Sequence, residues 1–387
     1  MKILQVISYF TSKRGGDVNI CYNLSKELSK LGHEVTIVTT DFEYDLNYAR
    51  SLKDVEVIPF RRVANLGLFL YTPHLGGWLR SNISRYDVIH LHNFRSYQSA
   101  IVCKYAKEFN VPYIVQPHGT LPRIVEKERL KQLYDLVWGN DILKHASKIV
   151  AVSGSEFRQF QQGNIPDGKI SVIPNGVNLV SLTTPPAGQF REQYNIYEKH
   201  VILYVGRIHK IKGIDFLIRA FNLFIQTWTG DNVVLVIVGP DDVYRLVLES
   251  LVEQLDLSSK VKFVDYISAV GAAYQDADVL VAPSFHEIFG LTPFEALLCG
   301  TPVIVTNNCG CGELVKKAKC GYLVPYGNVA GLSEALRYAL EHPDVNQRMV
   351  EAGQRYVEEY LRWESIVKQV EKLYENCLCG TDRKDFR

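Results

Sequence analysis

The sequence lacks several features that would place it in a simple class. No apolar run reaches the roughly 18 residues of a membrane-spanning helix, and the apolar stretch at residues 1–10 is short and has no small-residue cleavage site. The formal charge of +1 gives no overall field for nucleic acid. We therefore expect a cytoplasmic protein that binds small ligands in local sites and no nucleic acid.

The sequence also lacks the usual signatures of a disulfide framework, a zinc site and a nicotinamide cofactor. Eight cysteines, several inside apolar segments, indicate reduced thiols rather than a disulfide framework in a chain of 387 residues. The C-x-C pairs have no histidines at zinc-site spacing, so we expect no bound metal. The glycines Gly15 and Gly16 do not form the G-x-G-x-x-G fingerprint, which argues against a nicotinamide cofactor.

The chain is long enough for two domains, and its pattern indicates two parallel sheets. Short β-branched runs alternate with segments of helical period, which is typical of α/β folds with helices on both faces of a sheet. A Pro-rich linker at residues 183–188 separates two series of predicted strands. The first series is 2–9, 35–40, 55–60, 88–91, 113–117, 149–153 and 171–174, and the second is 201–205, 233–238, 261–264, 279–282, 303–306 and 322–324.

The segment from His286 to Glu295 carries the clearest functional signal. Glu287 follows a predicted buried strand, at the edge where parallel sheets bind ligands. The amides of Phe289, Gly290 and Leu291 precede a helix and are placed to hold phosphate oxygens.

The second acid of this segment has two interpretations. With Thr292 as N-cap and Pro293 as first helical residue, Glu295 would be a capping-box glutamate. Alternatively, Glu287 and Glu295 contact opposite ends of one long ligand. A fully helical segment would separate them by roughly 12 Å, beyond the about 5 to 9.5 Å of paired glycosidase acids, which favours a ligand such as a nucleotide sugar.

Three other loops follow predicted strands. Arg207 and Lys212, after the first strand of the second domain, can bind a diphosphate and stabilise it as a leaving group, although a solvated basic loop is the alternative. Gly15 and Gly16 can admit a phosphate at a helix start, or form a flexible turn. His118 ends a strand and can contact the transferred sugar or the acceptor, or be structural.

These motifs, in this order, resemble the retaining GT-B glycosyltransferases of family 4. The resemblance spans nearly the whole chain and rests on the Gly15-Gly16, His118-Gly119-Thr120, 173–177 and Gly206-Arg207 motifs, on Lys212, and above all on Glu287-x7-Glu295 followed by Cys299-Gly300-Thr301-Pro302. It implies two Rossmann-like, doubly wound parallel-sheet domains facing a cleft. It also implies that the arginine and lysine bind the donor diphosphate, that Glu295 contacts the nucleotide ribose, and that Glu287 lies beside the donor sugar.

The sequence departs from the family pattern at Ile288, where many relatives have glycine, and in the Cys309–Glu313 stretch, so the fit of the donor sugar is open. Asp276 and Asp278 resemble the metal-binding D-x-D of a different glycosyltransferase fold. We expect instead that they join a helix to a strand, without metal.

We therefore predict a retaining hexosyltransferase that makes a polysaccharide or glycolipid. Residues 1–182 would bind a glycan or lipid-linked acceptor, residues 190–362 a UDP- or GDP-linked sugar, and residues 363–387 would cross back as a helix and tail onto the first domain. The predicted catalytic residues are Glu287, His118, Arg207 and Lys212. The alternatives are a sugar-nucleotide epimerase on the same fold and a non-catalytic nucleotide-sugar-binding protein.

Two basic and aromatic stretches, 63–80 and the helix-like 123–144, favour an acceptor at the membrane face. For the first of them, a buried loop and helix covering the sheet is the alternative.

Overall fold

The computed structural model describes residues 1–13, 16–66, 69–121, 128–178, 186–267 and 269–379. The chain divides into two compact units, one formed by Met1–Gly176 with Trp363–Arg387 and the other by Val177–Arg362. From the sequence we predict a first domain that ends at residue 182, a second domain at residues 190–362, and a return to the first domain from residue 363.

The first unit is built on a parallel sheet of seven strands in the order β3-β2-β1-β6-β7-β8-β9. Every pairing in it is parallel, and β1 and β6 lie at its centre. All seven strands predicted for this half are present, with ends shifted by a few residues: β1 Lys2–Val6, β2 Glu34–Thr40, β3 Val55–Phe60, β6 Val88–His92, β7 Tyr113–Gln116, β8 Lys148–Ala151 and β9 Ile170–Val172.

Helices cover both faces of this sheet. One apolar cluster joins α1 and α16 to one face, and a second joins α3, α4 and α6 to the other. The helical segments of this unit are α1 Gly16–Lys30, α2 Leu46–Arg50, α3 Pro73–Asn82, η1 Ile83–Arg85, α4 Tyr97–Glu108, α5 Glu128–Tyr134, η2 Asp135–Gly139, α6 Asn140–His145, α7 Gly154–Gln162, η3 Asp167–Lys169 and α16 Trp363–Cys379.

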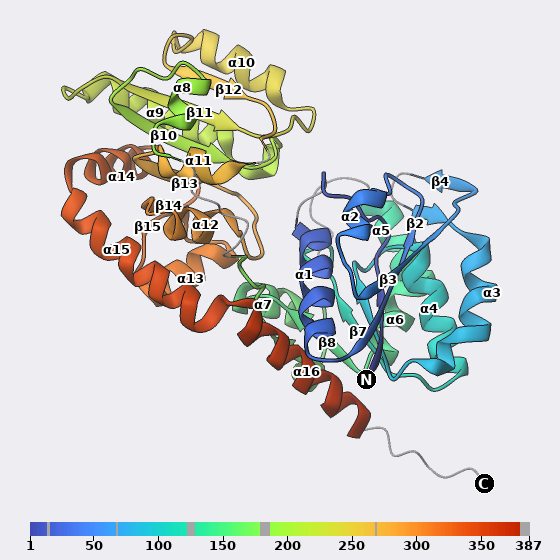
Figure 1. Cartoon of the computed structure of the whole chain (residues 1–387). Coiled ribbons are helices and arrows are strands. Elements are labelled where there is room, and N and C mark those ends of the chain that lie inside the picture. Colours follow the sequence, from blue (N-terminus) through green and yellow to red (C-terminus); the bar gives the residue numbers. More distant parts are fainter. Residues whose placement is uncertain (14–15, 67–68, 122–127, 179–185, 268, 380–387) are drawn as a thin grey trace. The chain divides into compact units, whose positions relative to one another are not determined.

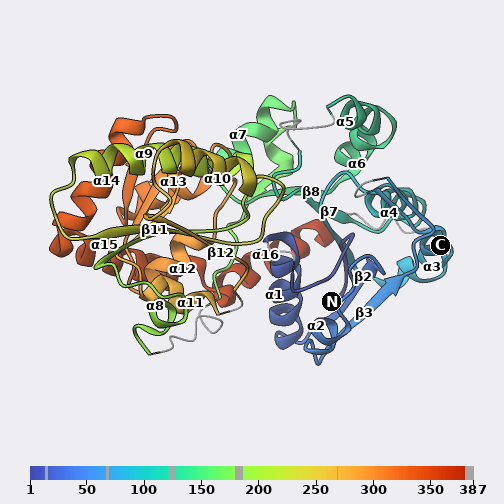
Figure 2. The ribbon, with the colours of Figure 1, turned by 90° about the horizontal axis from the view of Figure 1, so that it is seen from above.

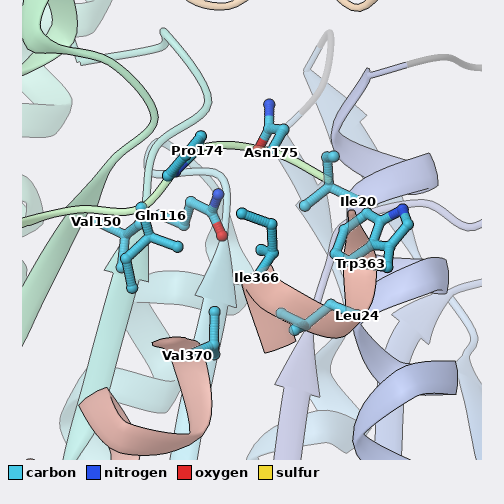
Figure 3. A pocket seen from close by; sticks show the side chains of 10 residues that line it. Ile20, Leu24, Gln116, Val150, Pro174, Asn175, Trp363, Ile366 and Val370 are labelled. Carbon is cyan, nitrogen blue, oxygen red and sulfur yellow. The ribbon is translucent and has the colours of Figure 1, made fainter. Parts of the chain in front are cut away.

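The last helix belongs to the first unit, as predicted. Its apolar residues recur at helical spacing, and α16 packs beside α1 on the sheet (Figure 1). Figure 3 shows the small crevice that the two helices share with the sheet, where Ile20 and Leu24 of α1 face Trp363 and Ile366 of α16. A side chain at Gly176 would overlap the Trp363 indole, so glycine is required at this crossing of the chain.

The basic and aromatic segment at 63–80 forms a short hairpin and a helix. The hairpin pairs β4 Ala64–Leu66 with β5 Phe69–Tyr71, and residues 67 and 68 lie outside the described residues. Leu70, Leu75 and Leu79 are buried in the core. Much of this segment therefore covers the sheet, which was the alternative to a membrane-facing surface.

The second unit repeats the architecture with six parallel strands in the order β12-β11-β10-β13-β14-β15. All six predicted strands are present: β10 His200–Val205, β11 Val233–Val238, β12 Val261–Val264, β13 Val279–Ala282, β14 Val303–Thr306 and β15 Tyr322–Val324. Figure 2 shows α9, α10 and α14 on one side of this sheet and α11 and α12 on the other. The helical segments are α8 Gln189–Gln193, η4 Lys210–Lys212, α9 Ile214–Thr227, α10 Arg245–Gln254, α11 Val270–Gln275, α12 Thr292–Leu298, α13 Gly310–Ala318, α14 Val329–Glu341, α15 Pro343–Tyr356 and η5 Val357–Leu361.

Because one face of α16 is buried, shortening a side chain on that face is expected to lower the free energy of unfolding substantially. Replacement of Ile366, which is 2% exposed, by alanine removes packed methylene groups and leaves a cavity. We expect the free energy of unfolding to fall by about 2 to 5 kcal/mol in urea titrations. Lys368→Ala on the exposed face of the same helix is the matched control, with an expected change within about 0.5 kcal/mol. Equal effects of the two substitutions would contradict this packing.

Candidate active site

The loop after β10 positions the two predicted phosphate-binding cations of the second unit. Arg207 is exposed, and Lys212 ends the short helical turn η4. Gly213 follows in a left-handed conformation with φ of 66°, and a Cβ there would lie 2.2 Å from the carbonyl oxygen of Pro283, just after β13. Glycine therefore lets the Lys212 turn approach the end of the neighbouring strand.

This approach brings Lys212 to Glu287. The Lys212 Nζ lies 2.5 Å from Glu287 Oε2, and the two side chains are 19% and 20% exposed. Burial raises the pKa of Glu287, but the Lys212 ammonium and hydrogen bonds from Lys212 and the Phe289 amide lower it more, so the net pKa lies below its ordinary value. Glu287 is thus a carboxylate at neutral pH.

The loop that follows Glu287 is held by close backbone packing. Gly290 has φ of 74°, and a Cβ there would lie 3.1 Å from Cβ of Cys311. The Gly310 amide donates to the Glu287 carbonyl oxygen at 2.8 Å. Cys309 and Cys311 behind this loop are buried free thiols, with their sulfur atoms 3.1 Å apart. The predicted phosphate-binding amides therefore lie on a loop of restricted conformation.

The start of α12 differs from the prediction in its cap. The helix begins at Thr292 with Leu291 as N-cap, and no side chain of the described residues caps it. Thr292 is therefore not the N-cap, because the Leu291 carbonyl already accepts from the Glu295 amide at 3.0 Å and starts the helix one residue earlier.

This shift removes the capping-box interpretation of Glu295. Its Oε2 instead accepts a hydrogen bond from the Tyr274 hydroxyl at 2.9 Å. Burial raises the pKa of Glu295 above its ordinary value, against the lowering effect of that hydroxyl. The carboxyl group is held by a neutral donor, which leaves its other oxygen available to a ligand hydroxyl.

Arg207 has a weaker attachment than Lys212. Its Nη1 donates to Asp242 Oδ2 at 2.8 Å, and both side chains are well exposed. Exposed pairs of this kind contribute about 0 to 1 kcal/mol, so an incoming phosphate can replace Asp242 at little cost.

The D-x-D motif is occupied by structural contacts. The Asp276 carboxylate accepts from the amides of Gly188, Phe190 and Arg191, and so anchors α8. Asp278 accepts from the Val201 amide at 2.7 Å. Asp276 is the C-cap of α11 and β13 begins at Val279, so the predicted junction between helix and strand is confirmed.

In the first unit, His118 follows β7 with φ of 51°, a left-handed conformation that is uncommon outside glycine and clusters at functional sites. Its Nε2 lies 3.0 Å from Nδ1 of His92. Gly16 begins α1, as expected for an open helix start, whereas Gly15 lies outside the described residues.

Glu156 anchors the loop that carries His118. Its two carboxyl oxygens accept from the amides of Gly119 at 2.9 Å and Val152 at 2.8 Å, and its side chain is fully buried. Burial raises the pKa of Glu156 to about 7, although both amides lower it.

Comparison with known proteins agrees with this architecture. The family model described as Glycosyltransferase Family 4 matches residues 14–181, and the model described as Glycosyl transferases group 1 matches residues 187–356. This chain belongs to the glycosyltransferases that these two models describe, family 4 and group 1. The two matches cover the two units in turn, and the fold is the GT-B fold.

Similar proteins match over nearly their whole length. An uncharacterized glycosyltransferase of Methanocaldococcus jannaschii is 27% identical, over 97% of this chain and 98% of its own. The N-acetyl-alpha-D-glucosaminyl L-malate synthase of Bacillus anthracis is 24% identical, over 98% of each chain. The Anabaena protein HepE, solved in complex with UDP-glucose, has a TM-score of 0.81 at 21% identity and covers 97% of this chain and 100% of its own.

Sequence reasoning missed several residues of this glycosyltransferase that support the predicted ones. Tyr274 supports Glu295 and Glu156 supports the His118 loop through contacts between segments distant in sequence, which no local sequence pattern predicts. His92 could have been found, because His90 and His92 alternate along the end of one buried strand, where polar side chains are costly unless bonded.

The raised pKa of Glu156 predicts a pH-dependent stability. A carboxyl group with a raised folded-state pKa contributes stability below about pH 4.5 that is lost as the pH rises through about 7. We expect wild-type protein to lose about 3 kcal/mol more than Glu156→Gln between pH 4.5 and 8, measured by urea unfolding at a series of pH values.

The difference between the two proteins isolates Glu156. Burial lowers the pKa values of His90, His92 and His118, which adds a slope of opposite sign below about pH 6.5 to both proteins. Parallel stability curves for wild type and variant would contradict the burial of an ionisable Glu156.

Proposed function

We propose that this glycosyltransferase moves a sugar from a nucleoside-diphosphate donor to a glycan or lipid-linked acceptor, with retention at the anomeric carbon. The main support is the largely buried Lys212–Glu287 pair at the carboxyl ends of β10 and β13. A nucleotide-sugar donor agrees with the UDP-glucose bound to HepE, which has the same fold. Retention rests on the family resemblance.

Each residue of the donor site has a role in this proposal. Arg207 and Lys212 bind the diphosphate and stabilise the negative charge that develops on the leaving oxygen as its bond to the sugar breaks. One well-placed donor of this kind contributes about 3 kcal/mol elsewhere. The amides of Gly290 and Leu291 approach phosphate oxygens, and that of Phe289 does so by exchanging its hydrogen bond to the Glu287 carboxylate for one to the phosphate.

The two acids contact the ends of the donor. Glu295, held by Tyr274, accepts from the nucleotide ribose, and Glu287 lies beside the donor sugar. We assign Glu287 no role as a nucleophile. His118 and Gly16 of the first unit are assigned to the sugar or acceptor and to phosphate, respectively.

We also propose that the reaction needs no metal. Arg207 and Lys212 supply the positive charge that a divalent cation would supply elsewhere. The carboxylates of Asp276 and Asp278 are already bonded to backbone amides, which makes them poor ligands.

The two alternatives differ in their products. A sugar-nucleotide epimerase would release an altered free donor in the absence of any acceptor, and a binding protein would release none. A non-catalytic binding protein is disfavoured because Glu287 and His118 are both present, and analysis of the products without acceptor distinguishes the epimerase.

Lys212→Ala is expected to lower the rate of sugar transfer by at least about 100-fold, because it removes a cation from the leaving group and leaves Glu287 without its partner. The assay uses a panel of UDP- and GDP-linked sugars with EDTA present, and the anomeric configuration of the product is read by NMR. Lys210→Ala is the matched control, since Lys210 lies exposed in the same turn, and it is expected to retain activity. Undiminished turnover of Lys212→Ala would refute the assignment, and loss of wild-type activity in EDTA would refute the metal-free proposal.

We propose further that the acceptor lies at a membrane surface. No helix among the described residues is long and apolar enough to cross a bilayer. The segment from α5 to η2, however, exposes five large apolar side chains at the surface of the first unit: Leu130, Leu133, Leu136, Val137 and Trp138. Contiguous exposed apolar side chains of this kind mark interaction sites, and exposed Arg129 adds a positive charge.

Vesicle flotation tests this surface. Wild-type protein is expected to float with anionic vesicles, and the double variant Leu133→Ser, Leu136→Ser to bind at least about tenfold more weakly, since both leucines lose apolar contact. Leu246→Ser is the control, because Leu246 is 80% exposed in the second unit. Equal flotation of all three proteins would rule out this surface as the contact.

A further inference from the structure

A chain of polar side chains lies beneath His118 inside the first unit. His92 Nδ1 is 3.0 Å from His118 Nε2, and His92 Nε2 is 2.8 Å from Gln5 Oε1. The Gln5 amide nitrogen donates to the Tyr374 hydroxyl at 3.2 Å, and that hydroxyl lies 2.7 Å from His90 Nδ1. Except for His118, every member is at most 2% exposed. The chain thus connects the end of β7 to α16.

The chemistry of Gln5 gives this chain a direction. With the Gln5 amide oriented so that its nitrogen donates to Tyr374, its Oε1 faces His92 and can only accept, so His92 carries its proton on Nε2. His92 is neutral at physiological pH because burial lowers its pKa, and its Nδ1 then presents a lone pair. The facing nitrogen, Nε2 of His118, must therefore donate.

The tautomer of His118 determines which atom it offers to a ligand. Burial lowers the pKa of His118 to about 4, against the raising effect of Asp17, so the ring is neutral at pH 7. With the proton on Nε2, the remaining nitrogen Nδ1 is a lone-pair acceptor. Among the described residues, Nδ1 of His118 has no hydrogen-bond partner.

We propose that His92 is a positioning residue that, together with Gln5, fixes His118 in the Nε2-protonated tautomer, so that Nδ1 accepts a hydrogen bond from a hydroxyl group of the sugar or acceptor. The inference rests on the proposed function for the identity of the ligand, but not for the tautomer. A hydroxyl fits this site because a neutral acceptor attracts a donor, and an anion would be repelled by its lone pair.

The tautomer is measured directly, without substrate. In protein labelled with ¹⁵N at histidine, the nitrogens of the two neutral tautomers have different chemical shifts, and the spectrum of His118→Gln assigns the His118 signals among those of ten histidines. The expected result is a protonated Nε2 and an unprotonated Nδ1 for His118. A protonated Nδ1 would overturn the proposal even if no variant at His92 folds.

Two amide substitutions separate positioning from packing. In His92→Asn the amide oxygen lies close to the place of Nδ1 and can still accept from His118, whereas in His92→Gln the amide lies close to the place of Nε2 and can contact only Gln5. We expect His92→Asn to retain most of the turnover rate. His92→Gln is expected to lower kcat by about tenfold, the effect of one hydrogen bond, and to lose the fixed tautomer.

A purely structural role would give the opposite order. Asparagine leaves the larger cavity at a buried position, so packing alone predicts that His92→Asn is the less stable and the less active variant. That order, measured with thermal melting as the control for folding, would overturn the proposal. Absence of sugar transfer by the wild-type protein would instead contradict the proposed function. The NMR measurement would still determine the tautomer of His118.

Discussion

The ion pair between Lys212 and Glu287 is the interaction on which the candidate donor site depends. Both side chains are about four-fifths buried, so each would be costly to keep charged without the other. The pair keeps Glu287 ionised and holds Lys212 at the end of β13. In the proposed function, the donor diphosphate binds a lysine that already has an anionic neighbour, so it must reach the Lys212 ammonium without a close approach to the Glu287 carboxylate.

The backbone around the pair explains how two loops reach this geometry. Gly213 brings the Lys212 turn against Pro283, and Gly290 brings the Glu287 loop against Cys311. The hydrogen bond from Gly310 to the Glu287 carbonyl ties the second loop to the start of α13. A larger residue at Gly213 or Gly290 would push the two loops apart and so separate Lys212 from Glu287, even with both charged residues unchanged. The ion pair therefore depends on these two glycines as well as on the charged residues.

Most of the fold could be predicted from the sequence, because buried parallel strands are continuous β-branched runs that alternate with amphipathic helices. Each of the 13 strands in the two large sheets lies where such a run occurs. The prediction failed at the start of α12, where Thr292 has good capping chemistry but Leu291 provides the first helical carbonyl. It also missed the hairpin of β4 and β5, whose strands are short and only partly apolar.

The site was predictable where the chemistry is local and not where it is tertiary. Arg207, Lys212 and Glu287 each follow a strand, so their common edge could be expected. The contact of Arg207 with Asp242, the support of Glu295 by Tyr274 and the anchoring of the His118 loop by Glu156 join segments 21 to 37 residues apart. No periodic pattern encodes such pairs, because they depend on which strand ends the topology makes neighbours.

Both units place polar groups near the ends of parallel strands, but the groups differ in charge. In the second unit, Lys212 and Glu287 are both charged. In the first, burial makes the imidazole of His118 neutral and raises the pKa of Glu156 to about 7. An ammonium that is already positioned and largely buried, as in Lys212, suits an anionic ligand, whereas a neutral imidazole suits a ligand recognised through hydroxyl groups. This difference between Lys212 and His118 agrees with the proposed assignment of the donor diphosphate to the second unit and of a hydroxyl-bearing ligand to the first.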